Sequence, residues 1–168
     1  MAEEHTEGPV ARDSPLHGAG TPAHHQPLLV LAVALGGLLG TPVRYAVGRW
    51  LPTPTDGWPT ATFLVNLVGA FLLGLLLEAL ARRGSDAGRR RALRLFAGTG
   101  FCGALTTYST LAVEVDLLVH ADRWAIAVAY GVASVSAGLV AAAAGIAVTG
   151  WLHRLRSRRV RTAVGSVR

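Results

Sequence analysis

The sequence contains no lysine, a single cysteine and few charged residues of either sign. The lone Cys102 excludes a disulfide framework and a zinc site built from cysteines. Without lysine there is no phosphate-binding loop ending in Gly-Lys-Ser/Thr, and no His accompanies a Ser or Cys nucleophile as in hydrolases. Only 15% of the 168 residues are charged, whereas soluble domains carry about 25%. These absences argue against a soluble protein and against an enzyme.

Apolar residues make up 51% of the sequence and gather in four long runs. A membrane-spanning helix needs about 20 apolar residues, so four such helices would take up roughly half of the chain. We therefore predict an all-α integral membrane protein with four transmembrane helices, at about residues 28–47, 61–81, 93–119 and 124–152.

The four runs together define a membrane domain at residues 27–152, with a segment of different composition on each side. Residues 1–26 are acidic and rich in Pro, Gly and His, and they lack the charged start and cleavage site of a signal peptide. The His residues in this leader are irregularly spaced, so a disordered segment is favoured over a metal site. Residues 153–168 form an Arg-rich tail.

Arginine is distributed very unevenly between the two sides of a four-span topology. Thirteen Arg lie in the leader, in or next to the loop between the second and third spans, and in the tail, whereas the other side has only Arg49 and Arg123. By the positive-inside rule, both termini are predicted to be cytoplasmic, in the cell inner (plasma) membrane. An Arg cluster directly after a span indicates topology or contact with anionic membrane lipid, and no nucleic-acid partner is expected.

Small residues recur at four-residue spacing in three of the spans. This spacing lets helix backbones approach closely in a membrane, and it indicates a packed bundle or oligomer without indicating a cargo. The pairs are Gly36 with Gly40, Ala70 with Gly74, Ser134 with Gly138, and Ala141 with Gly145.

The third span has an unusual composition for a membrane helix. Gly98, Gly100 and Gly103 are followed directly by the hydroxyl residues of segment 106–110, and this combination forms a poor helix. An interrupted helix survives at membrane depth only where its freed backbone groups are buried in protein or used by an ion. We therefore predict a broken third helix with an ion site, in preference to a glycine kink packed on a neighbour.

Polar side chains also occur singly inside the apolar runs, where they are costly. Asn66 and Thr62 lie one turn apart in the second span and offer either donors to an anion or an interhelical hydrogen bond. Tyr130 and Ser134, one turn apart in the fourth span, offer either a track of donors or, for the serine, a bond to its own backbone. Glu114 is a gate, a water-coordinating group or a hydrogen-bonded carboxyl, and Arg44 is an anion lure or an interfacial cation.

Three motifs of the sequence resemble the fluoride channels of the Fluc/CrcB family. They are GGLLG at 36–40 followed by Arg44, TxxxNLVGAF at 62–71, and GFCGALTTYST at 100–110 followed by Glu114. The resemblance covers about residues 28–152 and all four spans in order.

The resemblance implies an antiparallel dimer of four-helix subunits with a fluoride path along each side. It also implies a structural sodium ion at the dimer interface, held by backbone carbonyls at positions that correspond to Gly103 and Thr106. The implied fluoride path contains Asn66, Tyr108, Tyr130 and Ser134, with support from Thr62, Ser109, Thr110, Glu114 and Arg44.

The chain departs from the family pattern at the two phenylalanines that point ring edges at fluoride, which are Tyr108 and Leu111 here. A serine of the fourth helix is replaced by Gly138. Because the Arg bias is also strong, we hypothesise that the opposing subunit in the dimer is a related chain of opposite orientation, not a second copy.

The sequence as a whole predicts a fluoride-specific channel subunit that passively exports fluoride from the cytoplasm and relieves its toxicity. One alternative is a non-conducting partner subunit of a heterodimeric fluoride channel. A small four-helix multidrug exporter is less favoured, because that class uses a Glu in its first span and residues 28–47 contain none.

Overall fold

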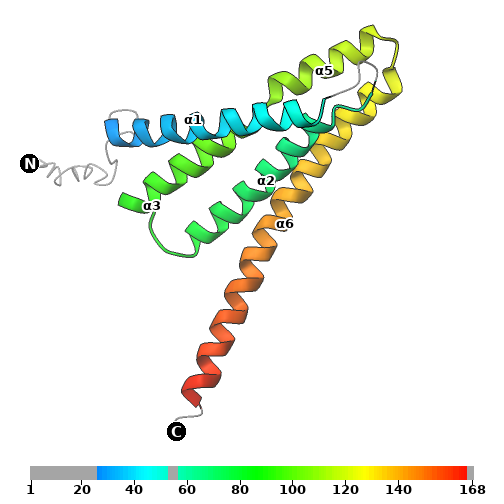
Figure 1. Cartoon of the computed structure of the whole chain (residues 1–168). Helices are drawn as coiled ribbons and strands as arrows, with labels where there is room; N and C mark the ends of the chain where they lie inside the picture. Colours follow the sequence, from blue (N-terminus) through cyan, green and yellow to red (C-terminus); the bar gives the residue numbers. More distant parts are fainter. Residues whose placement is uncertain (1–25, 53–56, 166–168) are drawn as a thin grey trace, which may run out of the picture.

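The computed structural model describes residues 26–52 and 57–165, except for the side chains of 158–165. In these residues all regular structure is helical (Figure 1): α1 (Pro27–Trp50), α2 (Thr60–Ala81), α3 (Gly88–Leu93), the π-helix η2 (Arg94–Cys102), α4 (Gly103–Leu105), α5 (Tyr108–His120) and α6 (Trp124–Gly165). The leader predicted at 1–26, with its His residues, lies almost entirely outside the described residues.

Four helical segments are long and apolar enough to cross a membrane. They are Pro27–Trp50, Thr60–Ala81, Gly88–His120 and Trp124–Ser157. Each contains or closely matches one of the predicted spans, so the all-α, four-span membrane fold is confirmed. The third of these segments is not one regular helix, because it runs through α3, η2, α4 and α5 in succession.

Helix α6 extends well past the rest of the bundle (Figure 1). Its 42 residues correspond to a length of about 63 Å at 1.5 Å per residue, whereas the hydrocarbon core of a membrane is about 30 Å thick. The predicted boundary between membrane domain and tail, at residue 152, therefore falls inside a continuous helix. It marks a change of composition rather than the end of an element.

The two halves of the third span pack against different helices. Before the break, η2 and α4 contact α1, and after the break α5 contacts α6. Helix α2 packs along α6 and also touches η2, α4 and α5. The break therefore transfers the chain from one side of the bundle to the other, with α2 in contact with both halves.

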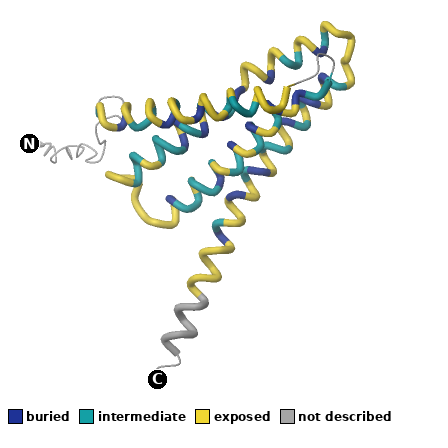
Figure 2. Tube along the Cα trace, in the orientation of Figure 1, coloured by how far each residue is buried: buried dark blue, intermediate teal, exposed yellow. Residues whose placement is uncertain are grey.

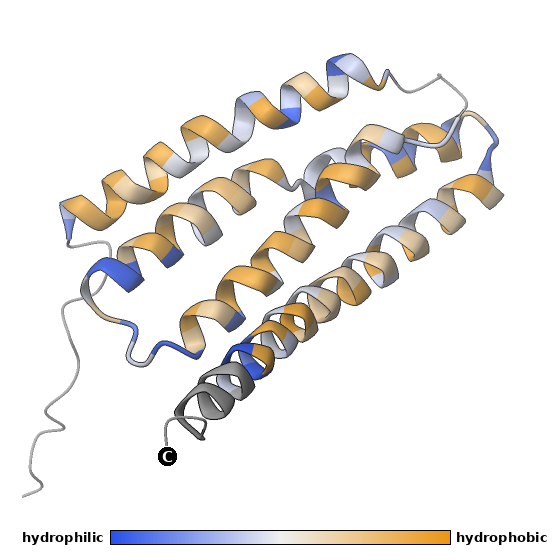
Figure 3. Cartoon of the chain, turned by 60° about the horizontal axis from the view of Figure 1, so that its bottom comes forward, coloured by the Kyte–Doolittle hydropathy of each residue, from blue (hydrophilic) through white to orange (hydrophobic). Residues whose placement is uncertain are grey.

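Many large apolar side chains are exposed on the described part of the chain, as expected for a protein surrounded by lipid. Leu38, Val128 and Leu139 are each more than 60% exposed, and Figure 2 shows exposed residues along the outer faces of all the long helices. Apolar residues continue along each span, whereas hydrophilic residues gather at the ends (Figure 3). Lipid accommodates such a surface, and the driving force for helix association then comes from close packing.

Glycines allow this close packing at two helix contacts. A Cβ atom on Gly100 would lie 2.9 Å from the Cα of Gly36, where η2 meets α1. On the other side of the bundle, a Cβ on Gly145 of α6 would lie 2.8 Å from the backbone nitrogen of Leu75 in α2. The predicted role of small residues in packing is thus confirmed at these contacts, but not at Gly138, where an added Cβ would meet no described atom of another element within 4 Å.

We expect Gly36→Ala to destabilise the protein by about 1–3 kcal/mol, because the added methyl group overpacks the contact between α1 and η2. Gly48→Ala in the same helix is the matched control, since a Cβ there meets no described atom within 4 Å. The control should be neutral or stabilising by up to about 1 kcal/mol. Thermal unfolding of the purified protein in detergent measures both, and equal effects would contradict the packing model.

Candidate functional site

The third span is broken at two consecutive threonines. Thr106 (φ −81°, ψ 158°) and Thr107 (φ −150°, ψ 124°) are extended, between the end of α4 at Leu105 and the start of α5 at Tyr108. The Thr107 hydroxyl oxygen caps α5 by accepting the backbone N–H of Thr110 at 3.1 Å. The predicted break is therefore present, and Thr107 serves as the N-cap of the second half-helix.

Asn66 of α2 satisfies both backbone groups of Thr107. The Thr107 N–H donates to Asn66 Oδ1 at 2.7 Å, and Asn66 Nδ2 donates to the Thr107 carbonyl at 3.0 Å. The mid-span amide is therefore engaged in an interhelical hydrogen-bonded pair, one of the two roles expected for it. Because Nδ2 carries two hydrogens, one further N–H remains after this bond.

The break changes the hydrogen bonding of two carbonyls in the first half of the span. In a continuous helix, the carbonyls of Gly103 and Thr106 would accept the N–H groups of Thr107 and Thr110, respectively. Here these N–H groups go instead to Asn66 Oδ1 and to Thr107 Oγ1. The carbonyls predicted to hold sodium are thus among those that lose their helical donors at the break.

These carbonyls belong to the C-terminal end of a half-helix, which carries partial negative charge. Backbone carbonyls are suitable ligands for a hard cation such as sodium. Gly103 is exposed on the outer face of the subunit, and a Cβ there would meet nothing closer than 3.9 Å. The Thr106 carbonyl also lies 3.4 Å from the guanidinium of Arg44 on α1, which donates to it. Gly103 therefore offers a carbonyl on an open face of the chain, whereas the Thr106 carbonyl already accepts the Arg44 guanidinium, whose positive charge opposes a second cation at that position.

Hydroxyl groups surround the break on the side of α5. The Thr107 hydroxyl donates to Thr110 Oγ1 at 2.9 Å and lies 3.2 Å from Ser109 Oγ. Ser109 and Thr110 are exposed on the subunit, and Tyr108 is 81% exposed. The beginning of α5 thus presents a polar and aromatic face at membrane depth.

A second polar group joins three helices deeper in the subunit. Glu114 of α5 accepts the hydroxyl of Thr62 at 2.7 Å and the phenol of Tyr130 at 2.6 Å. Tyr130 is completely buried, beside Leu111 and the edge-on ring of Trp58 at a centroid distance of 5.3 Å. Among the options for Glu114, this geometry corresponds to a hydrogen-bonded carboxyl.

Ser134 lies one turn after Tyr130 and is 9% exposed. Its Oγ is buried and forms no hydrogen bond of ordinary geometry among the described residues, although it lies within reach of the Tyr130 hydroxyl. A hydroxyl donor in this state is available to an anion. Ser136, two residues further on, instead donates to the Val132 carbonyl at 2.7 Å and is exposed.

The structure therefore brings the predicted residues together in two groups. Asn66 and Arg44 meet the break at Thr106 and Thr107, whereas Thr62, Glu114 and Tyr130 form a separate cluster with Ser134 one turn away. The exposed ring of Tyr108 joins neither group within the subunit. The sequence did not predict the contact of Trp58 with Tyr130. The one signal for it is the position of Trp58 directly before Pro59 and the start of α2.

Four spans, a broken third helix and polar side chains at membrane depth define a multi-pass membrane protein with features of an ion-conducting bundle. Comparison with known proteins identifies the family. The family model described as "CrcB-like protein, Camphor Resistance (CrcB)" matches residues 31–146. The chain belongs to the CrcB family.

Several curated relatives in this family are similar over most of their length. "Fluoride-specific ion channel FluC 1" of Cutibacterium acnes is 47% identical over 117 residues, which is 70% of this chain and 82% of the relative. "Fluoride-specific ion channel FluC 2" of Leifsonia xyli subsp. xyli is 45% identical over 127 residues, 76% of this chain and 87% of the relative. "Fluoride-specific ion channel FluC 2" of Rhodococcus jostii is 47% identical over 122 residues, which is 73% of this chain and 99% of the relative.

These matches confirm the resemblance of the three sequence motifs to the fluoride channels of this family. The family is one of ion channels, so the prediction that the chain is not an enzyme is also confirmed.

We expect Asn66→Leu to lower the stability of the protein by about 2 kcal/mol or more, because two backbone groups of Thr107 lose their partner and each costs about 1–3 kcal/mol when unsatisfied. Val68→Leu, at a position 47% exposed on the same helix, is the control and should change stability little. Thermal unfolding in detergent, with hydrogen exchange at the Thr107 amide, measures the effect. Unchanged exchange in the Asn66 variant would contradict the pairing.

Proposed function

We propose that this chain is a subunit of a fluoride-specific ion channel that passively exports fluoride from the cytoplasm. The observation that carries the proposal is the break at Thr106 and Thr107, where Asn66 hydrogen-bonds both backbone groups of Thr107. It occurs in a chain whose relatives are named fluoride-specific ion channels. Fluoride enters cells as neutral HF from acid surroundings and ionises in the cytoplasm. A passive anion channel is therefore enough to relieve its toxicity.

The donors suited to fluoride lie on α2 and α6. Fluoride is small and tightly hydrated, so a selective path must replace its water with several close donors. The remaining N–H of Asn66 offers one such donor, and the Ser134 hydroxyl, which forms no hydrogen bond of ordinary geometry among the described residues, offers another. The Tyr130 hydroxyl donates to Glu114 in this structure. It therefore joins the fluoride path only if it gives up this hydrogen bond and donates to fluoride instead. The Tyr108 ring adds an electropositive edge.

We propose a structural sodium ion at the carbonyls of Gly103 and Thr106, for which the loss of their helical donors is the support. When bound, sodium supplies positive charge beside the break and neutralises the partial charge of the half-helix end. Asn66 and the Thr107 cap hold the two backbone segments that define the site.

The exposed polar face at the start of α5 supports a dimer. Hydroxyl groups and a free helix end in contact with lipid are costly, since lipid offers them no hydrogen bonds. In our proposal a second, antiparallel subunit covers Gly103, Tyr108, Ser109 and Thr110. The sodium site and the fluoride path are then completed at the interface between subunits.

We further propose that the protein resides in the inner (plasma) membrane with both termini in the cytoplasm. The Arg distribution supports this orientation. It also favours the second candidate function, a non-conducting partner in a heterodimer, because an antiparallel homodimer requires one chain to insert both ways. Leu111 is buried beside Tyr130 and provides no ring edge, which favours the same alternative.

In liposomes containing the channel, we expect Ser134→Ala to reduce fluoride efflux about ten-fold or more, since a hydrogen bond to a charged group contributes about 1.5–3 kcal/mol. Ser136→Ala should leave efflux unchanged, because this hydroxyl bonds its own helix. A fluoride electrode records efflux, with chloride efflux as the selectivity control. Equal losses in both variants would contradict a donor role for Ser134.

The same assay separates the two candidate functions. Efflux from liposomes that hold this chain alone supports a self-sufficient channel. Efflux that requires a second, related chain supports the partner role.

We expect all copies of the chain to insert in one orientation. Cysteine tags at the two termini, probed with a membrane-impermeant thiol reagent in whole cells, should both be protected and should react only after lysis. Half of the copies reacting in intact cells, with no related chain present, would overturn the one-way insertion and the heterodimer that rests on it.

A further inference from the structure

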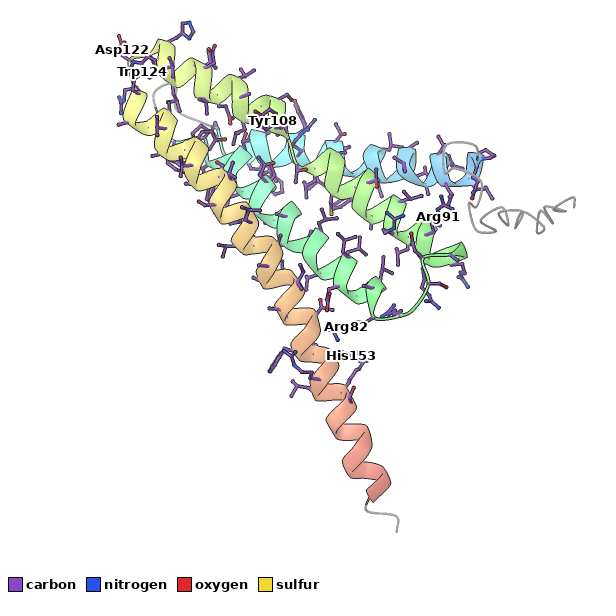
Figure 4. The ribbon with its side chains drawn as sticks, turned by 180° about the vertical axis from the view of Figure 1, so that it is seen from behind. Arg82, Arg91, Tyr108, Asp122, Trp124 and His153 are labelled. Atoms are coloured by element: carbon purple, nitrogen blue, oxygen red, sulfur yellow. The ribbon has the colours of Figure 1, made fainter. Side chains whose placement is uncertain are left out.

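A pocket of mixed polarity lies at the end of the bundle where the second and third spans are connected. It has a volume of about 340 Å³ and lies between the last turns of α2 and the start of the third span. Figure 4 shows Arg82 and Arg91 at this end and Asp122 and Trp124 at the opposite end. The lining residues are Leu77, Leu80, Ala81, Gly84, Ser85, Asp86, Arg90 and Arg94.

The loop backbone positions one guanidinium at this pocket. Arg90 donates to the backbone carbonyl of Arg83 and, at 3.4 Å, to that of Ser85. Gly84 has φ +98°, a conformation that favours glycine, and a Cβ there would lie 3.0 Å from Arg90 Nη1. The loop is thus shaped around the Arg90 side chain.

The charge of Arg90 is not compensated by a carboxylate. Its partners are neutral carbonyls, and no Asp or Glu forms an ion pair with it in the described part of the chain. Asp86 is instead paired with Arg94 at 2.7 Å, and the hydrogen bond from Arg94 holds the pKa of the Asp86 carboxyl below its ordinary value. The pocket therefore keeps a positive charge at neutral pH.

The opposite wall of the pocket is apolar. Leu77, Leu80 and Ala81 belong to the last turns of a membrane span, and Leu77 is 43% exposed. A guanidinium beside such a wall, at the end of two spans, matches a molecule with an anionic head and an apolar body. A free phosphate ion would use the guanidinium only and would leave the apolar wall uncovered.

We propose that this pocket binds an anionic phospholipid, with the lipid phosphate on Arg90 and the first part of the acyl chains along Leu77 and Leu80. This inference goes beyond the channel function and does not depend on it. The predicted cytoplasmic location of the loop agrees with it, since anionic lipids are enriched in the cytoplasmic leaflet.

The test is native mass spectrometry of the full-length protein in a neutral detergent, with phosphatidylglycerol or phosphatidylcholine added. We expect phosphatidylglycerol to bind and Arg90→Gln to weaken its binding about five-fold, the effect of one basic residue at an anionic membrane surface. Arg89→Gln is the matched control, because it removes the same charge from the same segment but does not line the pocket. It should change binding less than Arg90→Gln.

A second variant addresses the apolar wall. Leu77→Asn should also weaken phosphatidylglycerol binding, and soluble glycerol phosphate should neither bind the protein nor displace the lipid. Equal losses in the Arg89 and Arg90 variants, equal binding of phosphatidylcholine, or displacement of lipid by glycerol phosphate would overturn the proposal. Elution volume and thermal unfolding of each variant confirm that it is folded.

Discussion

A residue in extended conformation at membrane depth needs partners for both its N–H and its carbonyl, because lipid supplies none. At Thr107 both partners come from one side chain, the amide of Asn66. This pairing allows the third span to leave the helical path without unsatisfied backbone groups at Thr107. The separation of the half-helices, the loss of helical donors at the Gly103 and Thr106 carbonyls and the cap of α5 all depend on it.

Helix α2 holds the break and the second half of the third span through a single face. Thr62 and Asn66 are one turn apart, so their side chains point in the same direction. One contacts Glu114 of α5, and the other contacts Thr107 at the break. The first half of the third span packs on α1. Close packing of α1 against η2 at Gly36 and Gly100 allows Arg44 of α1 to reach the Thr106 carbonyl. The polar contacts at the break therefore depend on glycine packing elsewhere in the bundle.

The sequence alone was enough to predict the four spans and the broken third helix, because both follow from local composition. The partner of Asn66 could not be predicted, since Thr107 is 41 residues away in the chain and only helix packing brings them together. Ser134 and Ser136 show the same limit. Both are serines in one apolar run, yet one hydroxyl is buried and forms no hydrogen bond of ordinary geometry among the described residues, and the other bonds its own helix. Their difference comes from the direction each faces in the bundle.

Two physical constraints act on the dimer that we propose. The polar face at Tyr108, Ser109 and Thr110 is unfavourable in lipid, so it favours a second subunit laid against it. The Arg residues on one side favour insertion in a single orientation. Two copies that insert alike cannot pair antiparallel across this face. In our proposal both constraints are met by a related chain with the opposite Arg bias, which would cover the same polar face from the opposite direction.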